Sequence, residues 1–199
     1  MTNGKYVVIA GTPGTGKTTI AKLVGEKCRM EVFDLGKLAI EKGYILYYDE
    51  KRSTYVINEE KLVDYLKTVS RSSTELRVIH THYPETIPRE LVQLVFILRT
   101  NPIVLENRLL RRGWSRRKIN ENVMAEILGV VALNALNAFG EDVVFEVDTT
   151  NIDPEKSADT ICSVIKGELR LKPGVNIDWL EVIDPGEVAR FEEYVGSED

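Results

Sequence analysis

The feature that most constrains this chain is a glycine-rich loop at residues 11–18, which read GTPGTGKT and complete the pattern G-x-x-x-x-G-K-[S/T]. The apolar run YVVIA precedes it at residues 6–10, and the helical pattern TIAKLV follows it at residues 19–24. This pattern requires a strand before it and a helix after it. A helix cap with a glycine turn would not explain Lys17 and Thr18 directly after the third glycine. We therefore predict a nucleoside triphosphate site at this loop.

The residue types of the loop suit phosphate chemistry. Gly11, Gly14 and Gly16 allow backbone N–H groups to converge on phosphate oxygens, and the following helix N-terminus adds a partial positive charge. Lys17 is expected to reach the β- and γ-phosphates, and the Thr18 hydroxyl is a candidate ligand for Mg²⁺. The expected cofactors are ATP and Mg²⁺.

Composition limits the class of protein. With 199 residues, 43% hydrophobic and 29% charged, the chain suits one soluble domain with a real core. We find neither an apolar run of about 18 residues nor a visible signal peptide, so we expect no membrane span. Cys28 and Cys162 are far apart in the sequence, which favours a reduced, cytoplasmic chain. The net charge of −5 disfavours a general nucleic-acid binder, although a local basic patch stays possible.

Apolar runs and helical patterns alternate along the chain. We expect five strands, at residues 5–10, 31–34, 76–80, 94–98 and 143–147, and helices at residues 16–28, 59–70, 103–111, 117–139 and 154–169. Such alternation predicts an α/β fold of three layers, with a five-stranded parallel sheet covered on both faces. We expect this domain to span residues 1–170 and an appendage to occupy residues 171–199.

Polar residues gather where the predicted strands end. Asp34, the stretch His80-Thr81-His82 and the stretch Arg99-Thr100-Asn101 all lie at carboxyl ends, where such folds bind ligands. The two histidines of the chain both lie at one strand end, beside the expected phosphate site. We assign a function to His82 and leave His80 open between a function and a backbone hydrogen bond. No further Cys or His lies near them in sequence, so we expect no zinc site.

A basic segment at residues 108–118 packs six cationic residues into eleven positions. It could be a solvated helix end or a nucleic-acid contact. In a chain with a phosphate-binding loop, we interpret it as a lid whose arginines close over phosphates, because the guanidinium fork binds phosphate bidentately. Gly113 would act as a hinge, and closure would exclude water.

The segment after the predicted strand at 94–98 decides against a GTPase. A guanine-reading motif would place Asn-Lys-x-Asp there, but residues 99–102 read RTNP and lack the lysine and the aspartate. A small kinase needs an acceptor region and an arginine lid. Residues 35–58 and the basic segment are candidates for these two parts.

Several motifs together resemble a known family. They are GTPGTGKTT at residues 11–19, DLGKL at 34–38, YDE at 48–50, IHTH at 79–82, VFILRT at 95–100, and the single residues Arg108, Arg112, Gly113, Asn122 and Glu126. Over roughly residues 5–165 the chain resembles adenylate kinase isoenzyme 6, the archaeal and eukaryotic nucleoside monophosphate kinase-like ATPase of small ribosomal subunit maturation. The VFILRT stretch followed by the arginine lid is more specific than the loop.

The resemblance implies roles for particular residues. Residues 34–57 would form the monophosphate-binding region and residues 111–121 the lid. His82 would be the histidine of the family's Asp-x-His motif. The residues implied to bind the nucleotide are Gly14, Gly16, Lys17, Thr18, Thr19, Arg108, Arg112 and Asn151, with Asn151 near the adenine. Lys17, His82 and Arg112 are the implied catalytic residues.

Two positions depart from the family pattern. His80 replaces the aspartate of Asp-x-His, and a neutral imidazole cannot offset the charge of Mg²⁺ as a carboxylate does. The metal would then depend on Thr18, phosphates, water and a carboxylate such as Asp34 or Glu85. Ile40 replaces an arginine that often holds the monophosphate, and Arg52, Lys37 and Lys42 are candidate substitutes.

The expected function is that of an adenylate kinase with ATPase activity, which assists small ribosomal subunit rRNA maturation. Its expected partners are AMP, ATP and a basic small-subunit ribosomal protein. Two alternatives stay open. One is a nucleotide-switched ribosome assembly factor with incidental turnover, and the other is a small-metabolite kinase.

Overall fold

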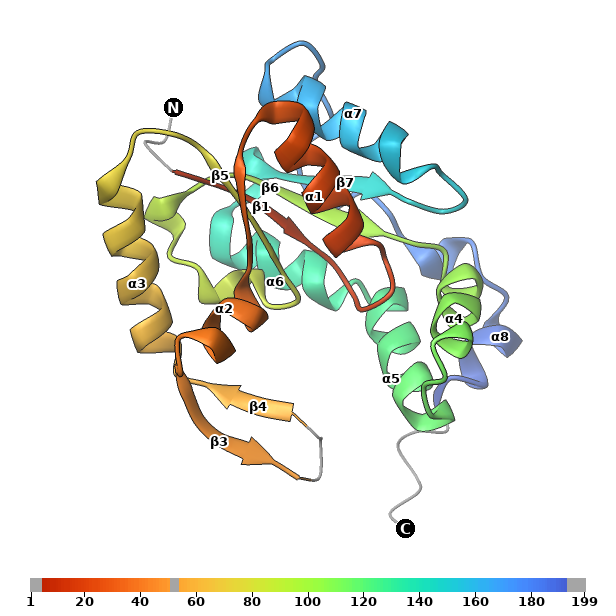
Figure 1. Ribbon diagram of the computed structural model, residues 1–199. Helices are drawn as coiled ribbons and strands as arrows, with labels where there is room; N and C mark the ends of the chain where they lie inside the picture. The colour runs from red at the N-terminus through yellow and green to blue at the C-terminus, as the bar shows by residue number, and fades with distance from the viewer. Residues whose placement is uncertain (1–4, 51–53, 193–199) are drawn as a thin grey trace.

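The computed structural model describes residues 5–50 and 54–192 (Figure 1). Its centre is a five-stranded sheet in the order β2-β5-β1-β6-β7, and every neighbouring pair is parallel. The strands are β1 (Tyr6–Ala10), β2 (Glu31–Asp34), β5 (Arg77–Thr81), β6 (Val92–Arg99) and β7 (Val144–Asp148). The prediction of a five-stranded parallel sheet is confirmed.

Helices cover both faces of the sheet, as Figure 1 shows. One face packs against α1 (Lys17–Cys28) and α7 (Pro154–Ile165), and the other against α2 (Leu35–Glu41), α3 (Glu59–Ser72) and α6 (Val130–Phe139). Side chains of β1 alternate between the two cores because successive residues of a strand point to opposite faces. Cys28 of α1 and Cys162 of α7 are both free thiols, and they belong to the core between these helices and the sheet.

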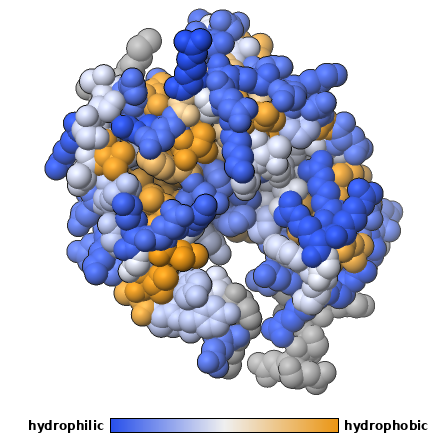
Figure 2. Space-filling view, in the orientation of Figure 1, coloured by the Kyte–Doolittle hydropathy of each residue, from blue (hydrophilic) through white to orange (hydrophobic). Residues whose placement is uncertain are grey.

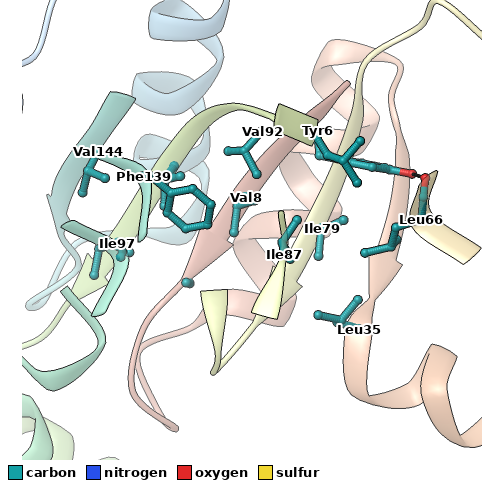
Figure 3. Packing of buried hydrophobic residues seen from close by; sticks show 14 of the residues in the cluster. Tyr6, Val8, Leu35, Leu66, Ile79, Ile87, Val92, Ile97, Phe139 and Val144 are labelled. Carbon is teal, nitrogen blue, oxygen red and sulfur yellow. Dashed lines mark hydrogen bonds between the residues drawn. The ribbon is translucent and has the colours of Figure 1, made fainter. Parts of the chain in front are cut away.

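The core on the α3 and α6 side is shown in Figure 3. Tyr6 is fully buried there, and its hydroxyl donates a 2.8 Å hydrogen bond to the Leu66 carbonyl of α3. The bond satisfies the one polar atom of a large apolar side chain, as buried tyrosines require. Phe139 of α6 packs with Ile97 and Val144 near the other edge of the sheet.

The prediction of one long helix at residues 117–139 is wrong. The segment forms α5 (Arg116–Ile127) and α6, which meet at an angle of 48°. The break lies at Gly129, whose φ of 62° is left-handed. The Arg99 guanidinium lies 3.7 Å from the position a Gly129 Cβ would take, and it donates a 3.0 Å bond to the Glu126 carbonyl. The helix therefore ends where this buried cation contacts its last turn.

No single helix in the described ranges is long and apolar enough to cross a membrane. The bent pair of α5 and α6 passes that test by length and composition alone.

The predicted monophosphate-binding region contains a structure that we did not expect. After α2 the chain forms an antiparallel hairpin of β3 (Ile45–Asp49) and β4 (Thr54–Ile57), which stands apart from the sheet (Figure 1). Tyr48 and Tyr55 meet edge to face across it, with ring centroids 5.0 Å apart. Arg52, one of the cations considered for the acceptor, lies outside the described residues.

The C-terminal segment, which comprises residues 173–191, packs against α4 (Pro102–Arg111) and α5. It contains the short helices η4 (Trp179–Glu181) and α8 (Pro185–Ala189). Trp179, Ile183 and Phe191 are buried in a third core with side chains of α4 and α5. The remaining 3₁₀ turns are η1 (Pro84–Thr86), η2 (Arg89–Leu91) and η3 (Glu141–Val143).

Candidate nucleotide-binding site

A cavity of about 480 Å³ lies at the carboxyl end of the sheet. The loop after β1, helix α2, the β3–β4 hairpin, the end of β5 and the end of α4 line it. Figure 2 shows the hollow between the hairpin at the lower left and the α4–α5 side at the lower right. Among the predicted site residues, those that line it are Gly14, Gly16, Lys17, Thr18, Thr19, His82 and Arg112.

Two further residues predicted to bind the nucleotide, Arg108 and Asn151, are outside the cavity lining, and their contacts with nucleotide stay predictions. Arg108 is partly buried beneath the loop, where it donates to the Thr149 carbonyl at 2.9 Å and to the Gly14 carbonyl at 3.4 Å. Asn151 is exposed just past β7, in a left-handed conformation with φ of 52°. Neither is among the residues that line the cavity.

The loop lies tightly against its neighbours. At Gly11, where φ is 148°, an added Cβ would lie 2.5 Å from the Leu98 carbonyl oxygen. At Gly14, where φ is 99°, it would lie 2.6 Å from Leu105 of α4. Both positions therefore require glycine for conformation and for space.

Lys17 is the buried cation of the cavity. It is 5% exposed, and its Nζ donates a 3.0 Å bond to the Thr12 carbonyl. Burial lowers the pKa of Lys17 to about 7, the negative charge of Glu126 opposes this shift, and Arg112 adds to it. Near neutral pH, the protein without nucleotide therefore holds Lys17 only partly charged.

This pKa leads to a prediction for nucleotide binding. A bound phosphate favours the charged ammonium, so binding above pH 7 requires uptake of a proton by Lys17. Below pH 7 Lys17 is already charged and the affinity for Mg·ATP should be flat. Above it, the affinity should fall by up to about tenfold per pH unit. Calorimetry from pH 6 to pH 9 in buffers of different ionisation enthalpy measures both the affinity and the number of protons taken up on binding. Flat affinity without proton uptake would contradict the assignment, and Lys17→Met should abolish the dependence.

The two histidines differ in their surroundings. His80 is 6% exposed, and its Nε2 lies 3.7 Å from the Asp34 carboxylate. Burial lowers the pKa of His80, although the Asp34 charge opposes this. His82 lies on the cavity surface with Nδ1 3.5 Å from the Gly11 carbonyl, and desolvation and the charge of Lys17 lower its pKa. With its pKa lowered to about 4, the His82 imidazole is neutral at pH 7 and is able to accept a hydrogen bond there.

Oxygen donors for a metal ion are present beside the loop. Thr18 is exposed in the cavity, and the partly exposed Asp34 carboxylate lines the same space. Hydroxyl and carboxylate oxygens are donors that fit Mg²⁺. Glu85 is outside the lining and instead accepts a bond from Asn134. In the part of the chain that the structure describes, no group of three or more His, Cys, Asp or Glu side chains is arranged to hold a metal ion.

The far end of the cavity, beneath α2 and the hairpin, is largely apolar and acidic. Its lining includes Ile40, Tyr55, Ile57, Glu59 and Leu62. Of the two lysines considered as substitutes for an arginine, Lys37 pairs with Glu41 at 3.5 Å, and Lys42 lies over the Tyr65 ring. Neither lines the cavity, so the cations among its described lining residues are Lys17 and Arg112.

The basic segment divides its side chains between the cavity and other partners. Arg112 and Trp114 line the cavity on either side of Gly113, whose φ is 71°. Arg116 pairs with the buried carboxylate of Glu106 at 2.5 Å, and Lys118 lies 4.5 Å from the Trp114 ring. Tyr55 and Trp114 were not predicted as site residues. Their only sequence signal was an aromatic residue inside a segment already expected to contact nucleotide.

We expect Arg112→Ala to reduce turnover more than it weakens ATP binding, because an arginine that closes over phosphates acts mainly on transition-state charge. The expected loss is roughly 10²-fold in kcat, with Kd changed by less than about threefold. Single-turnover rates and equilibrium binding separate the two quantities. The matched control is Arg111→Ala, since Arg111 is outside the cavity lining. Weaker binding with normal turnover per bound enzyme would make Arg112 a binding residue only.

The sequence is similar to one protein family and to named archaeal proteins. Residues 7–129 match a family model described as "AAA domain". A "Putative adenylate kinase" of Saccharolobus solfataricus is 41% identical over 75% of this chain and 78% of that protein, and one of Pyrococcus abyssi is 35% identical over 89% and 93%.

Solved structures support the fold alone. Shikimate kinase of Acinetobacter baumannii aligns with a TM-score of 0.59 and 17% identity, over 84% of this chain and 96% of that one. Shikimate kinase of Bacteroides thetaiotaomicron gives 0.54 and 16%, over 81% and 98%. The fold is thus the α/β phosphate-loop kinase fold. By sequence the chain belongs to the AAA-domain family and to the family of the archaeal proteins named "Putative adenylate kinase".

Proposed function

We propose that the protein is a phosphotransferase that converts ATP and AMP to two ADP and also hydrolyses ATP to ADP and phosphate. The observation that carries this proposal is the cavity beside the phosphate-binding loop. Lys17 lines it together with residues of α2 and of the hairpin. One cavity thus offers a phosphate site and an adjoining acceptor site. The name of the archaeal relatives supports the same reaction.

Catalysis in this proposal is positioning and charge neutralisation. Loop N–H groups and Lys17 bind the ATP phosphates, while Arg112, which lines the same cavity, acts on the transferring group. Thr18 and Asp34 would hold Mg²⁺, which neutralises phosphate charge when bound. His82 orients the attacking water or the acceptor as a hydrogen-bond acceptor, because desolvation and the charge of Lys17 lower its pKa to about 4 and keep the imidazole neutral; it accepts the proton only as the water or the acceptor is deprotonated in the transition state.

We propose that AMP is a secondary acceptor. Ile40 lines the acceptor end without a positive charge for a monophosphate. A coupled assay of ADP formation with and without AMP tests the function, and we expect measurable ADP without AMP. Ile40→Arg should raise the transfer rate at low AMP. If no ADP forms in either condition, the function is wrong. If transfer exceeds hydrolysis by several orders of magnitude, another cation has taken the role of the arginine.

The assignment of His82 has its own test. His82→Ala should lower hydrolysis by about 10²-fold or more, with ATP affinity close to normal. Unchanged hydrolysis would remove the histidine from the mechanism.

We further propose that the chain is a member of the adenylate kinase isoenzyme 6 subfamily, acts in the cytoplasm and assists small ribosomal subunit maturation. The motif resemblance supports this, and the net charge of −5 suits a basic ribosomal protein partner. A pull-down with small-subunit ribosomal proteins at low salt, with and without ATP, tests it. Binding that ATP alters would also suit a nucleotide-switched assembly factor with incidental turnover. If no small-subunit protein binds, a plain nucleotide kinase is the better conclusion.

A further inference from the structure

A buried carboxylate joins the phosphate-binding loop to the C-terminal segment. Glu126 of α5 is 2% exposed. Its Oε2 accepts a 2.6 Å bond from the Thr12 hydroxyl of the loop. Its Oε1 accepts bonds from Arg99 Nε at 2.9 Å, from Thr100 N at 3.0 Å and from Trp179 Nε1 at 3.1 Å. Three parts of the chain, far apart in sequence, therefore share one carboxylate.

The C-terminal segment is bound into the same buried network at two more points. Arg99 pairs with Glu146 and donates a 3.1 Å bond to the Ile177 carbonyl. Glu146 accepts a 2.7 Å bond from Ile177 N and another from Asn176 N. Arg99, Glu126 and Glu146 have side chains only 2% exposed, so one cation faces two carboxylates out of water. N–H donors of the C-terminal segment help to stabilise the excess negative charge, which water cannot reach.

Thr12 connects this network to Lys17. Its hydroxyl donates to Glu126, and its carbonyl accepts the 3.0 Å bond from Lys17 Nζ and a 2.9 Å bond from the Thr15 hydroxyl. Glu126 thus acts on the position of the lysine through Thr12, without itself lining the cavity.

We propose that Glu126 is a positioning residue for phosphate binding by Lys17. We further propose that residues 173–191 complete the buried network around Glu126: Trp179 Nε1 donates to Glu126, and the N–H groups of Asn176 and Ile177 donate to Glu146. The inference rests on the proposed function, since it concerns the same nucleotide site. It gives the C-terminal segment a role in activity: the segment stabilises the carboxylate that holds the loop.

The first test is the affinity for Mg·ATP of Glu126→Gln, measured at one pH and expressed per folded molecule. The amide keeps the shape of the side chain but has one acceptor oxygen in place of two, so it cannot accept from both Thr12 and the Arg99 group, and the affinity should fall about tenfold. The matched control is Glu106→Gln, because Glu106 is a buried carboxylate that pairs with Arg116 and with Arg190 of the C-terminal segment and not with the phosphate-binding loop. Its thermal midpoint should fall as well, but its affinity for Mg·ATP should stay at the wild-type value, so the comparison separates a loss of positioning from a defect in folding alone.

The second test uses Thr12 and Trp179, in case Glu126→Gln does not fold. Thr12→Val removes the hydroxyl that donates to Glu126 and should lower kcat about tenfold, whereas Thr12→Ser keeps it and should restore the rate. Trp179→Phe keeps the ring in its core but loses the N–H donor, and should lower kcat severalfold. Leu180→Ala, at a neighbouring exposed residue, is the control.

The outcomes separate the inference from the proposed function. If the wild-type protein does not bind Mg·ATP, the proposed function fails. If the wild-type protein binds Mg·ATP but Glu126→Gln binds it with the same affinity, the positioning role of Glu126 fails alone. Equal rates in Thr12→Val and Thr12→Ser would overturn the link through the hydroxyl, and a wild-type rate in Trp179→Phe would overturn the role of the C-terminal segment.

Discussion

Replacement of Lys17 by methionine is expected to reduce ATP turnover by roughly 10²- to 10³-fold. Losses of this size are typical when an enzyme loses a preorganised hydrogen-bond donor that stabilises the charge developing in the transition state. The substitution removes a charge-assisted contact with the β- and γ-phosphates, which contributes about 1.5–3 kcal/mol to binding. Steady-state kinetics with Mg·ATP measure the loss. Full activity in Lys17→Met would show that the loop is not the phosphate site.

The same variant should keep its fold. Lys17 is 5% exposed, and burial of its ammonium group is unfavourable, as its lowered pKa shows. Methionine has a similar length and no charge to desolvate, so the thermal midpoint should equal or exceed that of the wild type. A large fall in the midpoint would mean that the activity loss reports unfolding instead.

Gly11→Ala is expected to destabilise the protein by about 3 kcal/mol and to abolish nucleotide binding. The new methyl group would meet the Leu98 carbonyl oxygen at 2.5 Å, and φ of 148° strains any residue with a side chain. Because Leu98 belongs to β6, whose backbone is fixed by the strands on both sides, the loop and not the strand must move. Denaturant unfolding and equilibrium binding measure the two effects.

Gly167→Ala separates the clash from the backbone strain. Gly167 follows α7, has φ of 74° and has open space around its Cβ position, so its substitution should destabilise by only about 1 kcal/mol and leave nucleotide binding intact. If Gly11→Ala unfolds at the same denaturant concentration as Gly167→Ala and still binds ATP, the loop does not lie against β6 as described.

The centre of the sheet was predictable because β1, β5 and most of β6 are buried on both faces. Such strands appear in a sequence as short apolar runs, and the expected ranges lie within one or two residues of the observed bounds at most ends. The break in the helix at residues 117–139 was not predictable. A single glycine inside a long apolar pattern indicates little, and the contact that explains the break comes from Arg99, 30 residues away in sequence.

The β3–β4 hairpin was missed although its residues favour strands. Tyrosines, isoleucine and valine occur at residues 44–48 and 54–57, but many of their side chains are exposed and give no buried alternation. An exposed two-stranded hairpin leaves only a weak pattern, because β-propensity depends on packing.

The candidate site also has a part that the sequence predicts and a part that depends on tertiary packing. Lys17, Thr18 and the loop glycines follow from a local motif, because eight consecutive residues determine their geometry. The contacts of Arg108 with Thr149 and Gly14 depend on how α4 packs beside the loop, so no local motif indicates them. The bond between Glu126 and Thr12 joins residues 114 positions apart, so no local pattern indicates it.

The most direct test of the central claim follows the γ-phosphoryl group itself. The wild-type protein is incubated with Mg²⁺, AMP and ATP labelled at the γ-phosphate, and the labelled products are separated. We expect label in the β-phosphate of ADP, together with labelled inorganic phosphate, and neither product in Lys17→Met above background. Label that appears only in inorganic phosphate would contradict transfer to AMP, and the absence of any labelled product would contradict the phosphotransferase as a whole.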